Sequence, residues 1–414
     1  MDYFEYRDKK LYAERVRVAE IVRQFGTPLY LYSRRTCLEH FRRIEEAFAQ
    51  AQPLICYSVK ANSNLAILRI MAQAGAGFDV VSGGELYRTL KAGAEPKKIV
   101  FAGVGKTREE IEYALKENIL ILNVESPSEL EEMNHIAGAR EKTLDVALRI
   151  NPGISPETHE YVKTAEIGSK FGMEISAAEE LVRQRGKYPN LRFAGLHMHI
   201  GSQITSTSPF AQALERLVEF AHTCRSLGMD VQWLDIGGGF GIYYKEKEAK
   251  TAQELAAVIL PWVEKAGAKL ILEPGRFIVG NAGILVTEVL YCKESGGKRF
   301  IIVDAGMNDL IRPSLYGAYH RIWPIEPEDE KELETVDIVG PVCESGDFFA
   351  KDREIPLVKE GEHLAIFSAG AYGMAMSSQY NSRPRAAEVL VDGSEFRLVR
   401  ERETYEDLIR GEEI

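Results

Sequence analysis

The sequence has few cysteines and no long apolar run. Its five cysteines are widely separated and form no CxxC pair, so neither a disulfide framework nor a structural zinc site is expected. A reducing cytoplasm is therefore the expected location. The N-terminal stretch MDYFEYRDKK is too polar for a signal peptide, and no stretch approaches the roughly 18 apolar residues that a membrane-spanning helix needs. The cysteines are Cys37, Cys56, Cys224, Cys292 and Cys343.

An excess of basic charge is also missing. Lysine and arginine number 51 against 62 acidic residues, which gives a formal net charge of -11. Nucleic acids and anionic membranes are bound through basic patches, so neither is expected as a partner. No GxGxxG or GxxxxGK[ST] sequence is present, which disfavours a dinucleotide fold and a P-loop. A small anionic ligand remains compatible with this charge, because it needs only local donors.

What is present favours two domains. The chain has 414 residues, 45% of them hydrophobic, which is enough for two cores. Short β-rich runs alternate with helical stretches over roughly 220 residues, a rhythm typical of a (β/α)8 TIM-like barrel. A doubly wound open sheet is the alternative. The expected strands are Leu54–Val59, Phe78–Ser82, Ile99–Ala102, Leu120–Val124, Asp145–Ile150, Phe193–His199, Gln232–Ile236 and Lys269–Glu273.

Several helices between these strands carry start signals. Three pairs have the spacing of a capping box, in which a hydroxyl and a glutamate three residues later satisfy each other's backbone N–H groups. Ser126, followed by Pro127, predicts an N-cap with proline at the first helical position. The three pairs are Thr107 with Glu110, Ser176 with Glu179, and Thr251 with Glu254.

After about Ala282 the pattern changes to short β-rich runs separated by turns. Asp392-Gly393 stands between two such runs, as in a hairpin. We expect a barrel domain at residues 34–282 and a β-rich domain formed by residues 1–33 together with residues 283–414. The expected strands of the second domain are Leu29–Tyr32, Ile284–Tyr291, Arg299–Val303, Thr335–Val339, His363–Phe367, Ala387–Val391 and Glu395–Val399.

Two charged groups stand where barrel strands are expected to end, which is where barrels place their chemistry. Lys60 follows the first strand; a partly desolvated lysine there suits imine formation, although a solvated lysine is the simpler interpretation. Glu273 ends a strongly apolar strand, and Pro274-Gly275 turns the chain so that Arg276 points back. Such a carboxylate can keep the pyridine nitrogen of pyridoxal phosphate (PLP) protonated; a structural ion pair is the alternative.

Two further strand ends are polar or glycine-rich. Gly237, Gly238 and Gly239 let backbone N–H groups approach a phosphate, although the turn can equally be no more than tight. His197 and His199 alternate along a strand and so face the same side. No third metal ligand with suitable spacing is visible, so no metal site is expected. A ring stacked on an aromatic cofactor, or a core histidine, are the remaining interpretations.

Loops of the β-rich domain carry further polar residues. They suit a zwitterionic substrate, although loop residues of this kind are usually just solvated. The residues are Arg312, Tyr316, Cys343, Glu344 and Tyr372.

Together these segments resemble a known family. YSVKAN, FDVVSGGEL, HMHIGSQ, DIGGGFG, EPGR, VDAGMNDLIRP, GPVCESGD and GAYGMAMSSQYNSRPR follow, in order, the motifs of the fold-type III PLP-dependent decarboxylases. The resemblance runs from about Gly26 to Val391. It implies a PLP barrel with a C-terminal β-domain, as in alanine racemase and ornithine decarboxylase, and an obligate homodimer with shared active sites. HIGSQ, RPSLYGAYH, CESGD and NSRPR are most similar to the diaminopimelate decarboxylase branch.

The resemblance implies roles for individual residues. Lys60 would bind PLP covalently, Glu273 would pair with the pyridinium nitrogen, where alanine racemase has an arginine, and His199 would stack on the ring. The substrate's distal carboxylate would be bound by Arg276, Arg312 and Tyr316, and its distal ammonium by Glu344. Cys343 and Glu344 would come from the partner subunit. The implied cofactor-binding residues are Lys60, Asp79, His199, Ser202, Gly237, Gly238, Gly239, Glu273, Gly275, Arg276 and Tyr372, and Tyr372 would also contact the substrate.

The implied reaction is decarboxylation of meso-2,6-diaminopimelate at its D-centre to L-lysine. Either Lys60 or Cys343 would supply the proton that replaces CO2. Two segments depart from the branch pattern: Thr164–Gly168 before SKFG, and Arg385-Ala386-Ala387 where a second RP is common. A decarboxylase of a related D- or L-diamino acid, or a non-catalytic relative, therefore remains an alternative.

Overall fold

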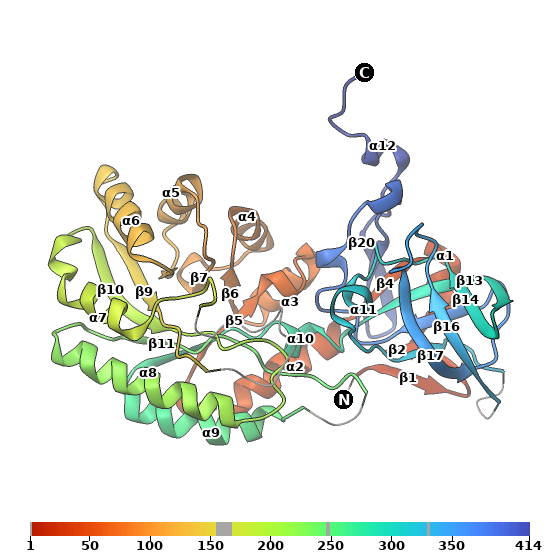
Figure 1. Ribbon diagram of the computed structural model, residues 1–414, viewed down its shortest axis with the longest axis horizontal. Coiled ribbons are helices and arrows are strands. Elements are labelled where there is room, and N and C mark those ends of the chain that lie inside the picture. The colour runs from red at the N-terminus through yellow and green to blue at the C-terminus, as the bar shows by residue number, and fades with distance from the viewer. Residues whose placement is uncertain (1, 155–167, 246–248, 329–331) are drawn as a thin grey trace. The chain divides into compact units, whose positions relative to one another are not determined.

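The computed structural model describes residues 2–154, 168–245, 249–328 and 332–414. The chain divides into two compact units (Figure 1). The barrel unit consists of Phe41–Ile242 and Glu248–Phe277. The β unit consists of Met1–His40, Tyr243–Lys247 and Ile278–Ile414. The departure noted at Thr164–Gly168 lies outside the described residues except for Gly168.

The barrel unit contains a closed barrel of eight parallel strands that follow one another in chain order. The expected (β/α)8 barrel is confirmed, and the open doubly wound sheet is excluded. All eight expected strands are present, with ends shifted by one or two residues. The strands are β5 (Leu54–Ser58), β6 (Gly77–Val80), β7 (Ile99–Phe101), β8 (Ile121–Val124), β9 (Leu144–Arg149), β10 (Leu191–His197), β11 (Trp233–Asp235) and β12 (Lys269–Leu272).

Helices alternate with these strands and lie outside the barrel (Figure 1). Their buried faces pack on the strands and fill the space between neighbouring helices. The helices are α2 (Arg34–Ala47), α3 (Leu65–Gln73), α4 (Gly83–Ala92), α5 (Arg108–Glu117), α6 (Pro127–Ala139), α7 (Ile175–Arg183), α8 (Ser208–Ser226) and α9 (Ala252–Ala266).

The expected helix starts are confirmed in three cases out of four. Thr107 and Thr251 form complete capping boxes, and Ser126 accepts a hydrogen bond from the N–H of Glu129 with Pro127 at the start of α6. The box expected at Ser176 is wrong. Helix α7 begins at Ile175 with Glu174 as its N-cap, two residues before Ser176 and directly after the parallel bridge between Met173 and Ile150. Ser176 therefore lies inside the first turn, where its side chain has no capping role.

Apolar side chains from six strands fill the interior of the barrel. They are fully buried, so the lower layers form a packed core and leave the carboxyl ends of the strands for polar groups. These residues are Cys56, Val100, Ile121, Ala147, Ala194 and Ile271.

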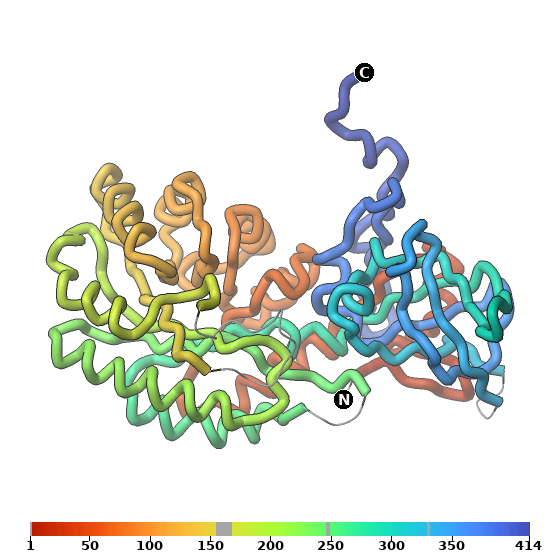
Figure 2. Tube along the Cα trace, viewed as in Figure 1, coloured from red at the N-terminus to blue at the C-terminus, as the bar shows by residue number. Residues whose placement is uncertain are grey.

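The β unit contains two sheets, and Figure 2 follows the chain through them. A three-stranded antiparallel sheet is formed by β1 (Phe4–Arg7), β2 (Lys10–Ala13) and β3 (Val16–Arg17). A nine-stranded sheet has β4 (Leu29–Ser33) near its centre, antiparallel to β13 and parallel to β19. Its other strands are β13 (Gly283–Ser295), β14 (Lys298–Val303), β15 (Ile322–Pro324), β16 (Leu333–Val339), β17 (Phe348–Pro356), β18 (His363–Ile366), β19 (Ala387–Asp392) and β20 (Glu395–Arg400).

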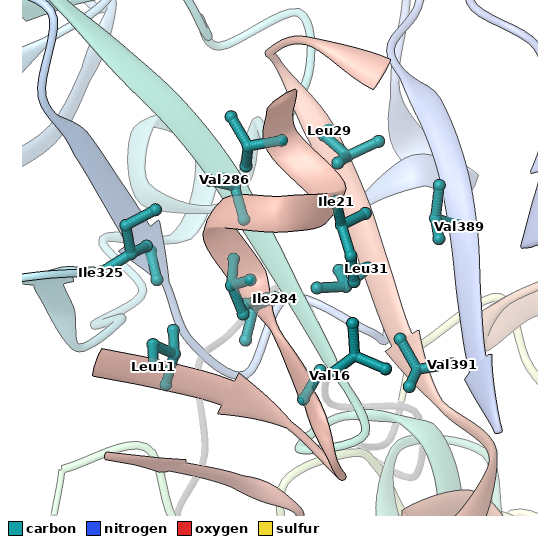
Figure 3. Close-up of a cluster of buried hydrophobic side chains, with 14 of the residues drawn as sticks. Leu11, Val16, Ile21, Leu29, Leu31, Ile284, Val286, Ile325, Val389 and Val391 are labelled. Carbon is teal, nitrogen blue, oxygen red and sulfur yellow. The ribbon is translucent and has the colours of Figure 1, made fainter. Parts of the chain in front are cut away.

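The core of the β unit forms where helix α1 (Val18–Phe25) covers the larger sheet (Figure 3). Val18, Ile21 and Val22 of this helix are buried at the spacing of one helical face. They meet alternate residues of β4, β13 and β19, such as Leu31, which is also fully buried. The N-terminal strand is thus part of the β unit's main core.

The predicted strands of the β-rich region are confirmed, including the hairpin at Asp392-Gly393, where Asp392 pairs with Glu395. Strands β1 to β3, β15 and β17 were missed. In β17 the exposed residues Lys351 and Asp352 interrupt the apolar pattern. Within the described part of the chain, no helix combines the length and the apolar character that crossing a bilayer requires.

Candidate active site

Lys60 lies one residue beyond the end of β5, in a single 3-10 turn (Val59–Ala61). Its Nζ donates a hydrogen bond to Oδ2 of Asp79 at 2.7 Å, and Ser58 Oγ donates to the same oxygen at 2.6 Å. Asp79 is fully buried at the end of neighbouring β6, and its Oδ1 has no partner among the described residues. Lys60 is therefore paired at the barrel mouth, unlike a solvated lysine past a strand.

Burial raises the pKa of Asp79, and the nearby Glu273 carboxylate adds to this effect. The Lys60 amine and the Ser58 hydroxyl act in the opposite direction. Because two donors converge on one oxygen, the side chain of Asp79 is fixed, and it holds the lysine amine at a defined position. That arrangement suits a lysine that must exchange partners during a reaction.

Glu273 follows the last residue of β12 and is 3% exposed. Its Oε2 lies 3.6 Å from Nε2 of His197, and its Oε1 is buried without a partner among the described residues. Although burial opposes ionisation, the His197 imidazole and then the Lys60 amine hold the pKa of Glu273 below its usual value. The residue is therefore an anion with one oxygen still available to a donor.

Among the described residues, Glu273 and Arg276 do not form the structural ion pair that was the alternative interpretation of the EPGR sequence. Nη2 and Nε of Arg276 donate to Ser202 Oγ, at 2.9 and 3.3 Å. Arg276 is 7% exposed and begins the short helix α10 (Arg276–Val279). Ser202 follows β10, so this contact joins the loops after two different strands.

Asp235 is a buried carboxyl group that the sequence interpretation missed. It ends β11, and its oxygens accept hydrogen bonds from the Gly237 N–H at 3.0 Å and from Asn123 Nδ2 at 3.4 Å. Burial and the adjacent Glu273 carboxylate raise its pKa well above the usual value. Asp235 is therefore the protonated member of the pair, and Glu273 is the charged one. Its position at a strand end, two residues before three consecutive glycines, was the signal that could have identified it.

The sequence predicts no metal site at the histidines, because no third ligand with suitable spacing is visible, yet two carboxyl groups lie close to His197 in the fold. The ligand atoms of His197, Asp235 and Glu273 all lie within 4.8 Å of one another and are buried. The residues are far apart in the sequence, and the pairing of the neighbouring strands β10, β11 and β12 brings their side chains together. Their spacing along the chain therefore does not reveal the cluster. Both Asp235 oxygens already accept hydrogen bonds from protein donors. The two carboxyl groups are therefore better suited to sharing a proton than to binding a metal ion.

His199 lies just past the end of β10 and is half-buried. Its Nδ1 accepts a hydrogen bond from the Gly238 N–H at 3.2 Å, so any ring proton of the neutral form is on Nε2. Burial, with the nearby Lys60 and Arg149 cations, lowers its pKa to about 3. A neutral, flat ring that is fixed at one nitrogen is suited to stacking.

The three consecutive glycines allow strand-end loops to approach one another. A Cβ on Gly238 would lie 2.2 Å from the carbonyl oxygen of Glu273. A Cβ on Gly239, whose φ is 89°, would lie 2.5 Å from the carbonyl oxygen of Gly201. The N–H groups of Gly237 and Gly238 already donate to Asp235 and His199. Of the three glycine N–H groups, that of Gly239 is therefore the one that remains available to a phosphate.

Gly275 is needed for the same kind of close approach. A Cβ there would lie 2.9 Å from Ser58 Cβ and 3.0 Å from Ala61 Cβ. The loop after β12 thus packs directly against the turn that carries Lys60.

The remaining sequence-predicted site residues lie in the β unit. Arg312 begins α11 (Arg312–Tyr316), is 5% exposed, and donates from Nη1 to His320 Nε2 at 2.9 Å. Tyr316 ends the same helix and is half-buried. Tyr372 is also half-buried and has a left-handed backbone, with a φ of 57°. Left-handed non-glycine residues of this kind cluster at functional sites.

Cys343 and Glu344 are exposed on the loop before β17. The Cys343 N–H donates to Asn381 Oδ1 at 2.9 Å, and Tyr380 donates its hydroxyl proton to Glu344 Oε2 at 2.7 Å. Asn381 is left-handed, with a φ of 56°. The sequence interpretation did not include Tyr380 or Asn381 as site residues, although both lie in the SSQYNSRPR segment that it quoted.

Comparisons with known proteins agree with this geometry. Residues 34–280 match the family described as pyridoxal-dependent decarboxylase, pyridoxal binding domain. Diaminopimelate decarboxylase from Aquifex aeolicus is 50% identical over 98% of this chain and 96% of its own length. The Vibrio cholerae enzyme of that name is 46% identical over 99% of this chain and 98% of its own length. The chain belongs to the diaminopimelate decarboxylase family.

Solved structures of family members are also similar. Diaminopimelate decarboxylase from Helicobacter pylori, complexed with L-lysine, has a TM-score of 0.92 and 44% identity, covering 95% of this chain and 98% of that one. The M. jannaschii enzyme, also in complex with L-lysine, has a TM-score of 0.95 and 39% identity, covering 100% of this chain and 98% of that one. The sequence-based assignment to this family and the predicted fold are confirmed.

The barrel site fits the pyridoxal group for which the family is named. The buried, unpartnered Oε1 of Glu273 is an acceptor suited to a protonated ring nitrogen. Lys60 provides an amine at the barrel mouth, and His199 provides a neutral ring. The Gly239 N–H, Ser202 and Arg276 provide donors for a phosphate. These features come from the ends of four strands of one barrel, β5, β10, β11 and β12.

Proposed function

We propose that this protein removes the D-centre carboxyl group of meso-2,6-diaminopimelate as CO2 and releases L-lysine, using PLP. The observation that carries the proposal is Glu273: a buried carboxylate, kept ionised, with one oxygen left without a partner among the described residues. A site with that oxygen favours a cofactor that presents a cationic N–H. The identity to enzymes named diaminopimelate decarboxylase supports the choice of substrate.

Bound PLP supplies an electron-withdrawing ring that accepts the electron pair left when the carboxyl group departs. Glu273 holds the proton on the ring nitrogen, and Asp235 keeps its own proton and so leaves the negative charge on Glu273. His199 would stack on the ring and, being neutral, would add no charge there. Lys60 anchors the cofactor covalently, and Asp79 holds the amine in position. The proton that replaces CO2 comes from Lys60 or from Cys343.

The far end of the substrate carries a carboxylate and an ammonium group, so it needs a cation and an anion together. Arg276, Arg312 and Tyr316 bind the carboxylate, and Glu344 binds the ammonium. Tyr372 contacts cofactor and substrate. A substrate such as ornithine has no distal carboxylate, which would leave Arg312 without a role.

The protein acts as a homodimer in this proposal, with Cys343 and Glu344 of each active site supplied by the partner subunit. The exposure of both side chains supports this part, because exposed polar loop residues are available to another subunit. Residues 34–282 serve as the PLP-binding domain, and residues 1–33 with 283–414 contribute to the substrate site and the dimer interface. A cytoplasmic location rests only on the scattered cysteines.

The test is a substrate panel. The protein is incubated with PLP and with meso-diaminopimelate, D- and L-lysine, D- and L-ornithine or L-arginine, and CO2 and products are measured. The proposal predicts CO2 and L-lysine from meso-diaminopimelate alone. Turnover only of a substrate without a distal carboxylate would contradict the substrate assignment, and no turnover at all would favour a non-catalytic relative.

A further inference from the structure

A buried histidine, His320, makes close contacts with Arg312 in the β unit. It is fully buried at the end of the RPSLYGAYH segment, and its two ring nitrogens have different partners. Nδ1 lies 2.8 Å from the carbonyl oxygen of Phe367, and Nε2 lies 2.9 Å from Nη1 of Arg312. The reaction described above assigns no role to this residue.

The partners fix the protonation state of the ring. A carbonyl oxygen only accepts hydrogen bonds, so Nδ1 carries the proton and donates it. A guanidinium group only donates, so Nε2 is unprotonated and accepts. His320 is thus neutral, in the Nδ1–H form, and its lone pair is directed at one N–H of Arg312. An imidazolium in this position would present a proton to the guanidinium and lose that bond.

The surrounding contacts hold His320 itself in place. Arg353, on β17, donates to the His320 carbonyl oxygen at 2.7 Å. The Phe367 N–H also donates to the carbonyl oxygen of Arg321, the residue after His320. Phe367, which directly follows β18, therefore contacts both the His320 ring and the backbone next to it. The ring is therefore held to the larger sheet through backbone groups.

Tyr244 contacts both groups from a second direction. The Arg312 guanidinium lies 5.0 Å from the centre of the Tyr244 ring, within cation–π range. The rings of Tyr244 and His320 meet edge to face, with centroids 5.4 Å apart. One N–H of Arg312 is thus committed to His320 and one guanidinium face is adjacent to Tyr244, which fixes the plane of the group.

We propose that His320 is a positioning residue that, as a neutral acceptor anchored to the Phe367 carbonyl, orients the Arg312 guanidinium toward the substrate's distal carboxylate. The inference rests on the proposed function, because that function gives Arg312 its ligand. Bidentate recognition of a carboxylate depends on the plane of the guanidinium, so a residue that fixes this plane contributes to specificity. It contributes little to the electronic step.

The test compares two ligands that differ in the distal carboxylate. L-Lysine carries the carboxylate and ammonium group that meso-diaminopimelate keeps at its far end, and 1,5-diaminopentane lacks the carboxylate. Inhibition constants for both are measured on the PLP-loaded enzyme. In His320→Asn, the amide can still donate to Phe367, but the acceptor for Arg312 is lost. We expect its inhibition constant for L-lysine to rise by about tenfold or more, with that for 1,5-diaminopentane unchanged.

Further variants separate positioning from folding. In His320→Gln, the longer amide can place an oxygen near Arg312, so we expect part of the L-lysine affinity to return. His363→Asn, a change at a half-buried histidine on β18, is the control and should alter neither constant. KM for meso-diaminopimelate should rise with kcat little changed, because ground state and transition state use the same distal contact.

A double-mutant cycle gives the sharpest outcome. In an Arg312→Ala background, adding His320→Asn should cause no further loss of L-lysine affinity. An additive loss, or equal weakening of both ligands in the single variant, would overturn the inference. Failure of the proposed function is seen separately, because the wild-type enzyme would then not release CO2 from meso-diaminopimelate.

Discussion

The carboxyl groups of Asp235 and Glu273 lie side by side at the ends of neighbouring strands β11 and β12, and the two carry one negative charge. Their ligand atoms and those of His197 lie within 4.8 Å of one another. Burial and the Glu273 charge raise the pKa of Asp235, while His197 and Lys60 lower the pKa of Glu273 in spite of its burial. The charge therefore stays at Glu273, whose Oε1 has no partner among the described residues.

This relationship predicts opposite tolerance to amide substitution. Asp235→Asn replaces a neutral acid with a neutral amide that can still donate to Glu273, so PLP binding and kcat should change by only about two- to threefold. Glu273→Gln removes the charge and should lower kcat by roughly a hundredfold or more. Steady-state kinetics and the absorption spectrum of bound PLP measure both. A larger loss in Asp235→Asn than in Glu273→Gln would contradict the charge assignment.

Gly238→Ala should prevent the strand-end loops from packing. The added Cβ would lie 2.2 Å from a backbone oxygen, which cannot move without shifting β12. We expect a loss of about 1–3 kcal/mol in the free energy of unfolding, with weakened PLP binding. Gly105→Ala is the matched control, since nothing lies within 4 Å of a Cβ at that glycine. Urea unfolding of both variants checks this; equal stability would show that the loop can rearrange.

Asp309 predicts a pH dependence of stability. It is 1% exposed in the β unit, and burial raises its pKa from 3.8 to about 7. In the folded protein this acid takes up its proton below about pH 7, whereas the unfolded chain does so only near 3.8. Ionisation therefore disfavours the folded state, so the contribution of this group is favourable at low pH and is lost as the pH rises through 7.

Asp309→Asn mimics the neutral acid and should remove this dependence. At about pH 8 we expect a gain on the order of 3 kcal/mol in the free energy of unfolding, which shrinks toward zero near pH 4. Denaturant unfolding at several pH values measures it. Asp392→Asn, at an exposed carboxyl group, is the control. A gain that does not vary with pH would contradict the assignment.

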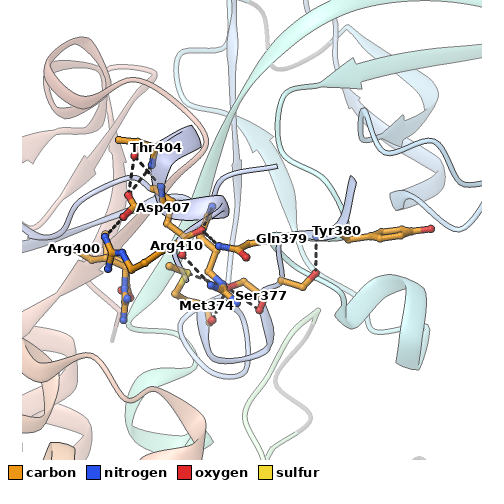
Figure 4. Close-up of polar contacts among 12 residues, drawn as sticks. Met374, Ser377, Gln379, Tyr380, Arg400, Thr404, Asp407 and Arg410 are labelled. Carbon is orange, nitrogen blue, oxygen red and sulfur yellow. Dashed lines mark hydrogen bonds and ion pairs between the residues drawn. The ribbon is translucent and has the colours of Figure 1, made fainter. Parts of the chain in front are cut away.

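Glu403 predicts an effect on substrate affinity from outside the site. Its carboxylate accepts hydrogen bonds from Gln379 Nε2 and Arg385 Nη1, both at 2.9 Å, and from the Arg385 N–H at 3.0 Å. The segment between these residues carries Tyr380, which donates to Glu344. Figure 4 shows polar contacts of this part of the chain, with Gln379 and Tyr380 labelled. The C-terminal residues thus hold the loop that orients Glu344.

In Glu403→Ala we expect the KM for meso-diaminopimelate to rise by about three- to tenfold, with kcat less affected, because the loop loses its anchor. The control is Asp407→Asn, which changes the nearby cap of α12 (Tyr405–Leu408) without touching the loop. Equal KM values in Glu403→Ala and wild type would show that the loop holds its conformation without this contact.

The barrel could be predicted from sequence because each strand is a short apolar run that ends in a polar or glycine residue. The positions of Lys60 and Glu273 followed from the same rule. The partners of these residues could not be predicted in this way: Asp235 meets Glu273 through strand pairing, and Asn381 meets Cys343 from 38 residues away. Ser176 failed as a cap because the helix has Glu174 as its N-cap and already includes Ser176 in its first turn.

The central claim is that Lys60, Glu273 and the residues around them decarboxylate meso-diaminopimelate. The most direct measurement is the release of CO2 and the identity of the amino-acid product from PLP-loaded wild-type protein and from Lys60→Ala. The account predicts L-lysine and CO2, mole for mole, from the wild type, and neither from the variant, which should also lose the absorption of covalently bound PLP. A product other than L-lysine, or equal CO2 release by Lys60→Ala, would contradict it.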